Sequence, residues 1–261
     1  MLNHFLQAKT EHRRLSMVTC YDYTLARVLS QTPVDALLVG DSAAMVMHGH
    51  PSTLSATVDM MRLHTEAVAR GAGGKFIVAD MPFLSFRKGV TAALDAAAVL
   101  MTAGAHAVKL EGIDGHEDVV GHLVQSGIPV MGHLGMQPQS VNQYGGFRVQ
   151  GRSEDSARAI VRQARSLEEL GAFALVLECI PAKLAGEVTG AIGIPTIGIG
   201  AGPCCDGQVL VLQDLLGLNL DFRPKFARPF ADGASSILDA LARFDGAVKN
   251  GDFPATGESY S

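Results

Sequence analysis

The chain has 261 residues, of which 48% are hydrophobic and 18% are charged, and its formal net charge is −5. This length suits one large domain with an extensive core, and the composition excludes a generally disordered chain. The negative charge and the lack of a lysine-arginine run argue against a nucleic-acid or acidic-membrane partner, because both require a basic surface.

Targeting segments and disulfides are not expected either. No eighteen apolar residues run together, so we expect no membrane span, and residues 1–14 lack the apolar run of a secretory signal. The four cysteines, Cys20, Cys179, Cys204 and Cys205, have no metal-type spacing. We therefore expect reduced thiols in a cytoplasmic protein, with Cys20 and Cys179 in the core.

Short apolar runs, typical of strands buried on both faces, alternate with segments of helical length. The predicted strands are 17–21, 36–40, 76–79, 107–111, 129–132, 174–177, 195–200 and, with the least apolar signal, 215–218. The predicted helices include 91–103, 116–125, 153–170, 181–193 and a terminal helix over 234–248. Ser153 followed by Glu154 and Asp155 is a typical helix start. This alternation predicts parallel βαβ units.

Charged or metal-binding residues end most of these apolar runs. They are Asp41, Asp80, Glu111, His133 and Glu178. In a closed barrel the carboxyl ends of all strands meet at one mouth, where barrel enzymes keep their active site, whereas an open doubly wound sheet concentrates ligands at one switch point. Because the polar residues follow many successive strands, we predict an α/β fold: a single (β/α)8 TIM barrel over residues 1–261, with N-terminal and C-terminal helical extensions.

Three carboxylates converge on the predicted mouth. Asp41 and Asp80 end consecutive strands and Glu111 ends the next one, so the three charges would repel one another without a cation between them. Oxygen ligands with open positions suit Mg2+. The alternative is that each acid caps the positive end of the following helix. We favour a metal site made of Asp41, Asp80 and Glu111.

Three further residues have candidate roles at this mouth. Lys109 and Glu111 are two apart on one strand, so their side chains share a face, and an inward lysine needs either Glu111 or a substrate carboxylate as partner. Glu178 lies across the mouth from the three acids, where it could take a proton from a metal-held substrate. His133 could donate a hydrogen bond to a developing oxyanion, or could be structural.

Two glycine-containing segments near the mouth have two interpretations each. Residues 198–202 could cradle a phosphate or form a tight turn. Residues 142–151 could be a mobile lid or an ordinary surface loop. Cys204 and Cys205 follow the first segment in a predicted loop, where they could be reactive or incidental.

Nine segments that carry these residues match one known family. They are 19–22, 39–42, 79–83, 108–112, 132–135, 138–140, 145–152, 177–179 and 197–202. In this order, over nearly the whole chain, the sequence resembles ketopantoate hydroxymethyltransferase. The resemblance implies a β/α barrel that binds Mg2+, assembles as a homodecamer and transfers a one-carbon unit from 5,10-methylenetetrahydrofolate to 3-methyl-2-oxobutanoate, in pantothenate biosynthesis.

The resemblance also assigns roles to single residues. The metal ligands are Asp41, Asp80 and Glu111; the keto-acid contacts are Asp41, Ser42, Asp80 and Lys109; the catalytic residues are Glu178 as base, Lys109 and His133. The chain departs from the family pattern at 43–44, where Ala-Ala replaces the usual Leu-Gly, and at Pro51, where an aspartate is usual. We expect these departures to affect lid geometry and turnover but to leave the chemistry in place.

Two other functions fit parts of the sequence. A magnesium-dependent keto-acid lyase of the phosphoenolpyruvate mutase and isocitrate lyase type shares the barrel and the metal-held keto acid. Such enzymes commonly carry a catalytic cysteine on a mobile loop, and the chain has no convincing equivalent. A non-catalytic keto-acid-binding barrel is disfavoured, because the acids, the lysine and the candidate base are all present. Folate-dependent transfer would distinguish the three.

Overall fold

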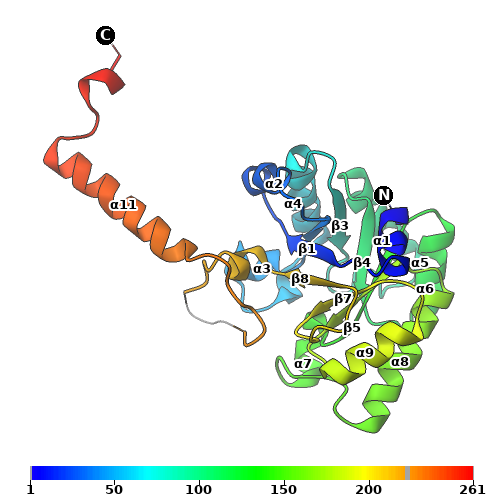
Figure 1. Cartoon of the computed structure of the whole chain (residues 1–261). Coiled ribbons are helices and arrows are strands. Elements are labelled where there is room, and N and C mark those ends of the chain that lie inside the picture. Colours follow the sequence, from blue (N-terminus) through cyan, green and yellow to red (C-terminus); the bar gives the residue numbers. More distant parts are fainter. Residues whose placement is uncertain (1, 221–223, 261) are drawn as a thin grey trace. The chain divides into compact units, whose positions relative to one another are not determined.

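The computed structural model describes residues 2–220 and 224–260, and the chain divides into two compact units, 1–210 and 211–261. The first unit is a closed barrel of eight parallel strands in sequential order, β1 to β8, surrounded by helices (Figure 1). The predicted (β/α)8 barrel is therefore confirmed.

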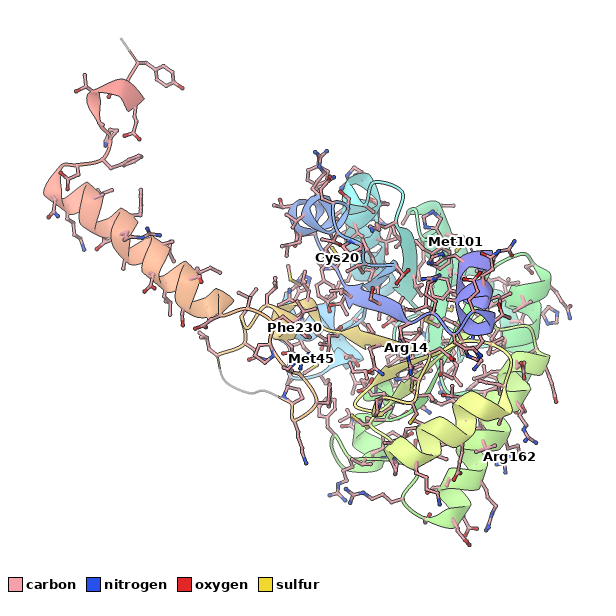
Figure 2. All side chains as sticks on the ribbon, in the orientation of Figure 1. Arg14, Cys20, Met45, Met101, Arg162 and Phe230 are labelled. Atoms are coloured by element: carbon pink, nitrogen blue, oxygen red, sulfur yellow. The ribbon has the colours of Figure 1, made fainter. Side chains whose placement is uncertain are left out.

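The strands are short, and four of the eight, β2 to β5, are buried along their whole length. They are β1 Leu15–Thr19, β2 Ala36–Val39, β3 Phe76–Asp80, β4 Ala107–Glu111, β5 Val130–Gly135, β6 Ala174–Glu178, β7 Thr196–Ile199 and β8 Gly207–Leu210. Seven of them overlap the predicted runs, because side chains cover both faces of these strands and most of their positions are apolar. Figure 2 shows the side chains on the ribbon.

The eighth strand was predicted at the wrong place. Residues 215–218 do not form it; β8 is Gly207–Leu210, and the helix α10 covers Leu212–Leu215. The strand contains a glycine and the exposed Gln208, so it lacks the continuous apolar run of the other strands. Its pairing with β1 and β7 supplies the stability that its sequence does not signal.

Helices follow most of the strands and cover the outside of the barrel (Figure 1). In this unit they are α1 Leu2–Thr10, α2 Tyr23–Leu29, α3 Ala43–Val46, α4 Val58–Gly71, α5 Val90–Thr102, α6 Glu117–Gln125, α7 Val141–Tyr144, α8 Glu154–Glu169 and α9 Ala182–Ala191, with 3-10 turns η1 Thr53–Ser55 and η2 Pro138–Ser140. The Ser153 side chain accepts a hydrogen bond from the Ser156 N–H, which confirms the predicted start of α8.

Helix α1 closes the amino end of the barrel. Its Phe5 ring lies 5.2 Å from the ring of Phe76 and 5.3 Å from that of Phe173, between centroids. All three residues belong to the buried core inside the strands. The opposite, carboxyl end of the barrel is therefore the end left for chemistry.

The register of the strands sets residues of the carboxyl end side by side. Asp80 pairs with Lys109 between β3 and β4, and Glu111 pairs with His133 between β4 and β5. Gly135 pairs with Glu178 between β5 and β6. Residues far apart in the chain thus become neighbours at the carboxyl end of the barrel.

The second unit contains α10, α11 Gly233–Asn250 and η3 Thr256–Glu258. The predicted terminal helix is α11, and none of its residues is buried. Its large apolar side chains are about half exposed and recur at helical spacing: Ile237, Leu238, Leu241, Phe244 and Val248. Among the described residues no helix is long and apolar enough to cross a membrane. The single catalytic domain over 1–261 stays a prediction.

Candidate active site

The predicted site residues all lie at the carboxyl ends of five neighbouring strands. Asp41 and Ser42 follow β2, Asp80 ends β3, Lys109 and Glu111 belong to β4, His133 to β5, and Glu178 ends β6. Five of them are nearly inaccessible to solvent, with 1–4% of their surface exposed: Asp41, Asp80, Lys109, Glu111 and His133. Burying so many ionisable groups is unfavourable unless they interact, and the contacts below show how they do.

Asp41, Asp80 and Lys109 form the first part of the site. The Asp41 backbone N–H donates to Asp80 Oδ2 at 3.0 Å. Lys109 Nζ lies 3.0 Å from Asp80 Oδ1. The expected protein partner of Lys109 was Glu111, two residues along the same strand; the ion pair is instead with Asp80, because the register sets Asp80 opposite Lys109.

His133 connects this part of the site to Glu178. Its Nδ1 lies 3.2 Å from Lys109 Nζ, and its Nε2 lies 3.2 Å from Glu178 Oε2. An ammonium group can only donate, so Nδ1 accepts and Nε2 carries the proton. Burial, reinforced by the Lys109 charge, lowers the pKa of His133 well below its usual value, so the ring is neutral. His133 does not end its strand as predicted, since β5 continues to Gly135.

Glu178 has the properties of a general base. Burial raises its pKa to about 7, against the opposing effect of the Lys109 charge. Its side chain is 16% exposed, so it faces the mouth more than the other candidate acids do. A carboxylate with a pKa near neutrality is ionised in part at pH 7 and takes protons more readily than an ordinary glutamate.

The backbone of Glu178 is held by the end of β5. The Met136 N–H donates to the Glu178 carbonyl oxygen at 2.8 Å. Gly135 has a φ of +94°, and a Cβ there would lie 2.2 Å from that same oxygen, so only glycine fits. The next residue, Cys179, has the left-handed φ of 47°.

The three predicted metal ligands carry mutually unfavourable charges. Burial and the Asp80 charge raise the pKa of Asp41 to about 7, and burial followed by the Asp41 charge raises the pKa of Glu111 well above its usual value. Glu111 Oε1 accepts no hydrogen bond from any described residue, and Asp80 Oδ1 has Lys109 as its ion-pair partner. A buried carboxylate oxygen without a hydrogen bond fits a hard divalent cation, which would offset the raised pKa values of Asp41 and Glu111.

The carboxylate oxygens of Asp41, Asp80 and Glu111 are not arranged as a complete set of metal ligands in the described residues. Among the described residues no three His, Cys, Asp or Glu side chains are arranged as a ligand set. Instead Lys109 contacts Asp80, and Gln139 donates from Nε2 to Asp41 Oδ2 at 2.8 Å. The metal-binding role of Asp41, Asp80 and Glu111 stays a prediction.

Gln139 is a residue of the site that the sequence analysis missed. It lies in η2, is only 6% exposed, and its backbone N–H donates to Glu111 Oε2 at 3.0 Å. Its side-chain amide also donates to the Met81 carbonyl oxygen at 3.0 Å. The residue belongs to a segment that matched the family, 138–140, and this was the one available signal.

Ser42 lies beside the acids and has a buried partner. The hydroxyl groups of Tyr21 and Ser42 are 2.8 Å apart. Burial raises the pKa of Tyr21, so the phenol stays protonated. Ser42 lies near Asp41 because the two residues are adjacent in the chain. The contact of Ser42 with the keto acid stays a prediction.

The other predicted features of the mouth have mixed outcomes. A Cβ on Gly202, whose φ is +78°, would lie 2.4 Å from the Ala182 Cβ, so residues 198–202 include a tight turn. The predicted lid, 142–151, begins within α7, and its Gln150 N–H donates to the Cys179 carbonyl oxygen at 3.0 Å. Motion of this segment and phosphate binding stay predictions.

All four cysteines are free thiols. Cys20 is buried as expected, whereas Cys179 is half-buried, and burial raises their pKa values to about 11 and about 12. Cys205 is buried too, and burial raises its pKa, so the predicted reactive position does not suit a thiolate. Cys204 is exposed.

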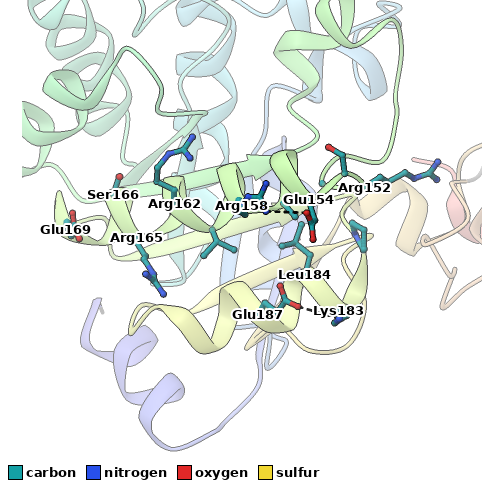
Figure 3. Close-up of a pocket in the computed structure, with 15 residues that line it drawn as sticks. Arg152, Glu154, Arg158, Arg162, Arg165, Ser166, Glu169, Lys183, Leu184 and Glu187 are labelled. Atoms are coloured by element: carbon teal, nitrogen blue, oxygen red, sulfur yellow. Dashed lines mark hydrogen bonds and ion pairs between the residues drawn. The ribbon is translucent and has the colours of Figure 1, made fainter.

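A groove of about 880 Å3 lies elsewhere, between α8 and α9 on the outside of the barrel (Figure 3). Its lining includes Arg158 and Leu184 and none of the predicted site residues. The Arg158 guanidinium pairs with Glu154 of the same helix. The ionisable residues of the mouth are therefore packed against one another, rather than around this groove.

Comparisons with known proteins agree with the resemblance seen in the sequence. The family model for ketopantoate hydroxymethyltransferase matches residues 1–256. A Bdellovibrio bacteriovorus protein named 3-methyl-2-oxobutanoate hydroxymethyltransferase is 55% identical over 98% of both chains. A Coxiella burnetii protein of the same name is 53% identical over 96% of this chain and 94% of its own length.

Solved structures share the fold at low sequence identity. A 2,3-dimethylmalate lyase has a TM-score of 0.62 at 16% identity, covering 99% of this chain and 91% of its own. A phosphonopyruvate hydrolase, in a complex with oxalate and Mg++, has a TM-score of 0.62 at 11% identity, covering 98% and 92%. These likenesses concern the barrel alone. The family model and the full-length relatives decide the matter: the chain belongs to the ketopantoate hydroxymethyltransferase family.

Proposed function

We propose that the barrel transfers a hydroxymethyl group from 5,10-methylenetetrahydrofolate to 3-methyl-2-oxobutanoate and so makes 2-dehydropantoate, a step of pantothenate biosynthesis. The observation that carries this proposal is the contact series across the mouth: Asp80 to Lys109, Lys109 to His133, and His133 to Glu178. It joins buried acids that could hold a keto acid to a carboxylate whose pKa is raised to about 7.

Asp41 and Asp80, with Glu111 beside them, are the proposed ligands of Mg2+. The burial of all three carboxylates and the raised pKa values of Asp41 and Glu111 support this assignment. When bound, the cation would supply the positive charge that makes the carbon next to the substrate ketone acidic. Oxygen-only donors of this kind favour Mg2+ over softer metals.

Glu178 is the proposed base. It removes the proton from the carbon next to the ketone, and that carbon then forms a bond to the folate methylene carbon. Neutral His133 lies beside this carboxylate, with its Nε2 atom 3.2 Å from Glu178 Oε2 but without a hydrogen bond between them. Lys109, held positive because the charges of Asp80 and Glu111 outweigh the opposing effect of burial on its pKa, offsets the negative charge of the substrate. Formation of this C–C bond breaks one of the two C–N bonds of the folate methylene, and the released nitrogen takes the proton that Glu178 removed. Water then replaces the second folate nitrogen: its hydroxyl stays on the methylene carbon, and its proton goes to that nitrogen.

The family relationship favours this transfer over the lyase alternative. The relatives of about half identity carry the transferase name, whereas the lyases and hydrolases share the barrel at 17% identity or less. Among the described residues the buried Cys205 and half-buried Cys179 are also poorly suited to the catalytic cysteine of such lyases. A purely binding barrel would not need a base of raised pKa.

The test is a product assay with purified protein, Mg2+, 3-methyl-2-oxobutanoate and 5,10-methylenetetrahydrofolate. Formation of 2-dehydropantoate in equal amount to released tetrahydrofolate supports the proposal. Cleavage of a C–C or C–P bond of a keto-acid substrate, without any folate requirement, would favour the lyase alternative. Keto-acid binding with no turnover of either kind would favour a binding barrel.

We also propose that the protein works in the cytoplasm as a homo-oligomer, by family likeness a decamer. The four free thiols suit a reducing compartment. The exposed apolar stripe of α11, led by Leu238 and Leu241 at 59% exposure each, supports association, because monomers rarely expose such surfaces. Light scattering of the purified protein measures the number of copies.

A further inference from the structure

Gln139 touches more of the mouth than its position suggests. Its Nε2 donates to Asp41 Oδ2 at 2.8 Å and to the Met81 carbonyl oxygen at 3.0 Å. Its backbone N–H donates to Glu111 Oε2 at 3.0 Å. One residue of a three-residue turn thus binds groups that follow or end β2, β3 and β4, the three strands that carry the acids.

We propose that Gln139 is a positioning residue of the acid site: its amide holds Asp41 and its backbone holds Glu111, so that the acids keep their arrangement before a cation arrives. This inference rests on the proposed magnesium site. It goes beyond that proposal because it assigns the arrangement to a neutral side chain that would not itself be a ligand.

The chemistry of the amide explains why a glutamine suits this position. Asp41 Oδ2 and the Met81 carbonyl oxygen can only accept hydrogen bonds, so the side chain between them must donate twice. The NH2 group of glutamine does this, whereas a glutamate of the same size would bring a third acceptor. The hydrogen bond from Gln139 to Asp41 also lowers the pKa of Asp41, against the larger raising effects of burial and of the Asp80 charge.

The backbone contact makes the arrangement of the acids depend on the turn as well. Glu111 Oε2 is occupied by the Gln139 N–H, whereas Glu111 Oε1 accepts no hydrogen bond from the described residues. Gln139 therefore fixes one oxygen of Glu111 and one of Asp41, and the turn leaves another carboxylate oxygen available to a cation. Partners of metal ligands that act in this way commonly change metal affinity by about 10- to 100-fold when they are lost.

The test compares Gln139→Leu and Gln139→Glu with a matched pair on the surface, Gln163→Leu and Gln163→Glu. Gln163 makes the same kind of contact, from Nε2 to Asp114 Oδ2 at 2.7 Å, but far along the exposed face of α8. Calorimetry of Mg2+ binding and thermal melts with and without Mg2+, at pH 8, are the readouts, so none of them depends on turnover.

We expect Gln139→Leu to weaken Mg2+ binding at least about tenfold. Without metal, Gln139→Glu should melt below Gln139→Leu, because acceptor faces acceptor, although glutamate is the better fit in size. Added Mg2+ should raise the melting temperature of Gln139→Glu more than that of Gln139→Leu. The Gln163 variants should bind Mg2+ as the wild type does.

Two results would overturn the inference. One is unchanged Mg2+ affinity in Gln139→Leu. If Gln139 only filled space, replacing it would lower the melting temperature and leave the Mg2+ affinity unchanged. The other is a metal-free Gln139→Glu that melts above Gln139→Leu. Should the wild type bind no Mg2+ at all, the proposed magnesium site fails, and the order of the two metal-free melting temperatures still decides whether the amide positions Asp41.

Discussion

The barrel holds a lysine-aspartate pair at each of its two ends, and the two pairs differ in how completely they are satisfied. At the amino end, Lys9 Nζ lies 2.9 Å from Asp206 Oδ2 and also donates to the Thr189 carbonyl oxygen. The Thr196 backbone N–H and hydroxyl donate to the same Asp206 oxygen. At the mouth, Lys109 pairs with Asp80.

The pair at the mouth, Lys109 and Asp80, is more deeply buried and lies closer to other charges than the pair at the amino end. Its side chains are 5% and 4% exposed, against 15% and 16% for Lys9 and Asp206, so solvent screens it less. Asp80 also lies near two other acids whose pKa values are raised. A cluster that stabilised the fold would not keep such repulsion, so the comparison assigns structure to the amino end and chemistry to the mouth.

The largest effect expected from the mouth is on the proton transfer. Glu178→Gln keeps the size of the side chain but removes its basicity, so turnover should fall about 1000-fold, within the usual range for a general base. Exchange of the substrate's C–H proton with heavy water, followed by NMR in the presence of Mg2+, measures the step directly. Full exchange in the variant would remove Glu178 from the role of base.

The next largest effect is on the cation. Asp41→Asn removes one of the proposed ligand charges and one source of repulsion with Asp80, so Mg2+ affinity should fall by more than about tenfold while the metal-free protein stays folded. Calorimetry gives the affinity and a thermal melt checks the fold. Wild-type affinity in this variant would contradict the ligand assignment.

The pH dependence of the wild type sharpens the same comparison. The pKa of Glu178 is raised to about 7, and a base must be ionised to act, so activity should be lost as pH falls through that value. One unit below, about a tenth of the carboxylate is ionised, and kcat/KM should be about tenfold under its plateau. A profile that stays flat between pH 5.5 and 8 would show that another group is the base.

The smallest effect belongs to the amino end and should appear in stability alone. Asp206→Asn removes the charge that Lys9 and Thr196 share, and we expect a loss of about 1–3 kcal/mol, which is several degrees in melting temperature. Its kcat and Mg2+ affinity should match the wild type. Reduced Mg2+ affinity with an unchanged melting temperature would reverse the roles assigned to the two ends.

Most of the barrel was predictable because burial on both faces leaves a continuous apolar run in the sequence. The strand that the prediction misses, Gly207–Leu210, is held mainly by pairing with its neighbours, so its own sequence carries little signal. The prediction falls instead on residues 215–218, which are more apolar. The C-terminal helix was predictable from its own periodicity, with ends that differ by one or two residues.

The site was predictable as a set of residues but not as a set of contacts. Convergence of strand ends follows from parallel topology, so Asp41, Asp80 and Glu178 could be grouped from the sequence. The partner of Lys109 depends on the register between two strands, which a single strand does not reveal. Gln139 could not be predicted as a site residue because the short turn η2 brings it close to Asp41, and the local sequence does not indicate the direction of that turn.

The close fit between Gly135 and the Glu178 carbonyl oxygen has a consequence for how the molecule can change. The end of β5 fixes the backbone position of Glu178, because the Met136 N–H donates to its carbonyl oxygen and Gly135, which has no side chain, packs against the same oxygen. Residues 142–151 add one contact beside it, from the Gln150 N–H to the carbonyl oxygen of Cys179, the next residue along the chain. The side chains of this segment can therefore vary without moving the proposed base, whereas any side chain added at position 135 would displace it.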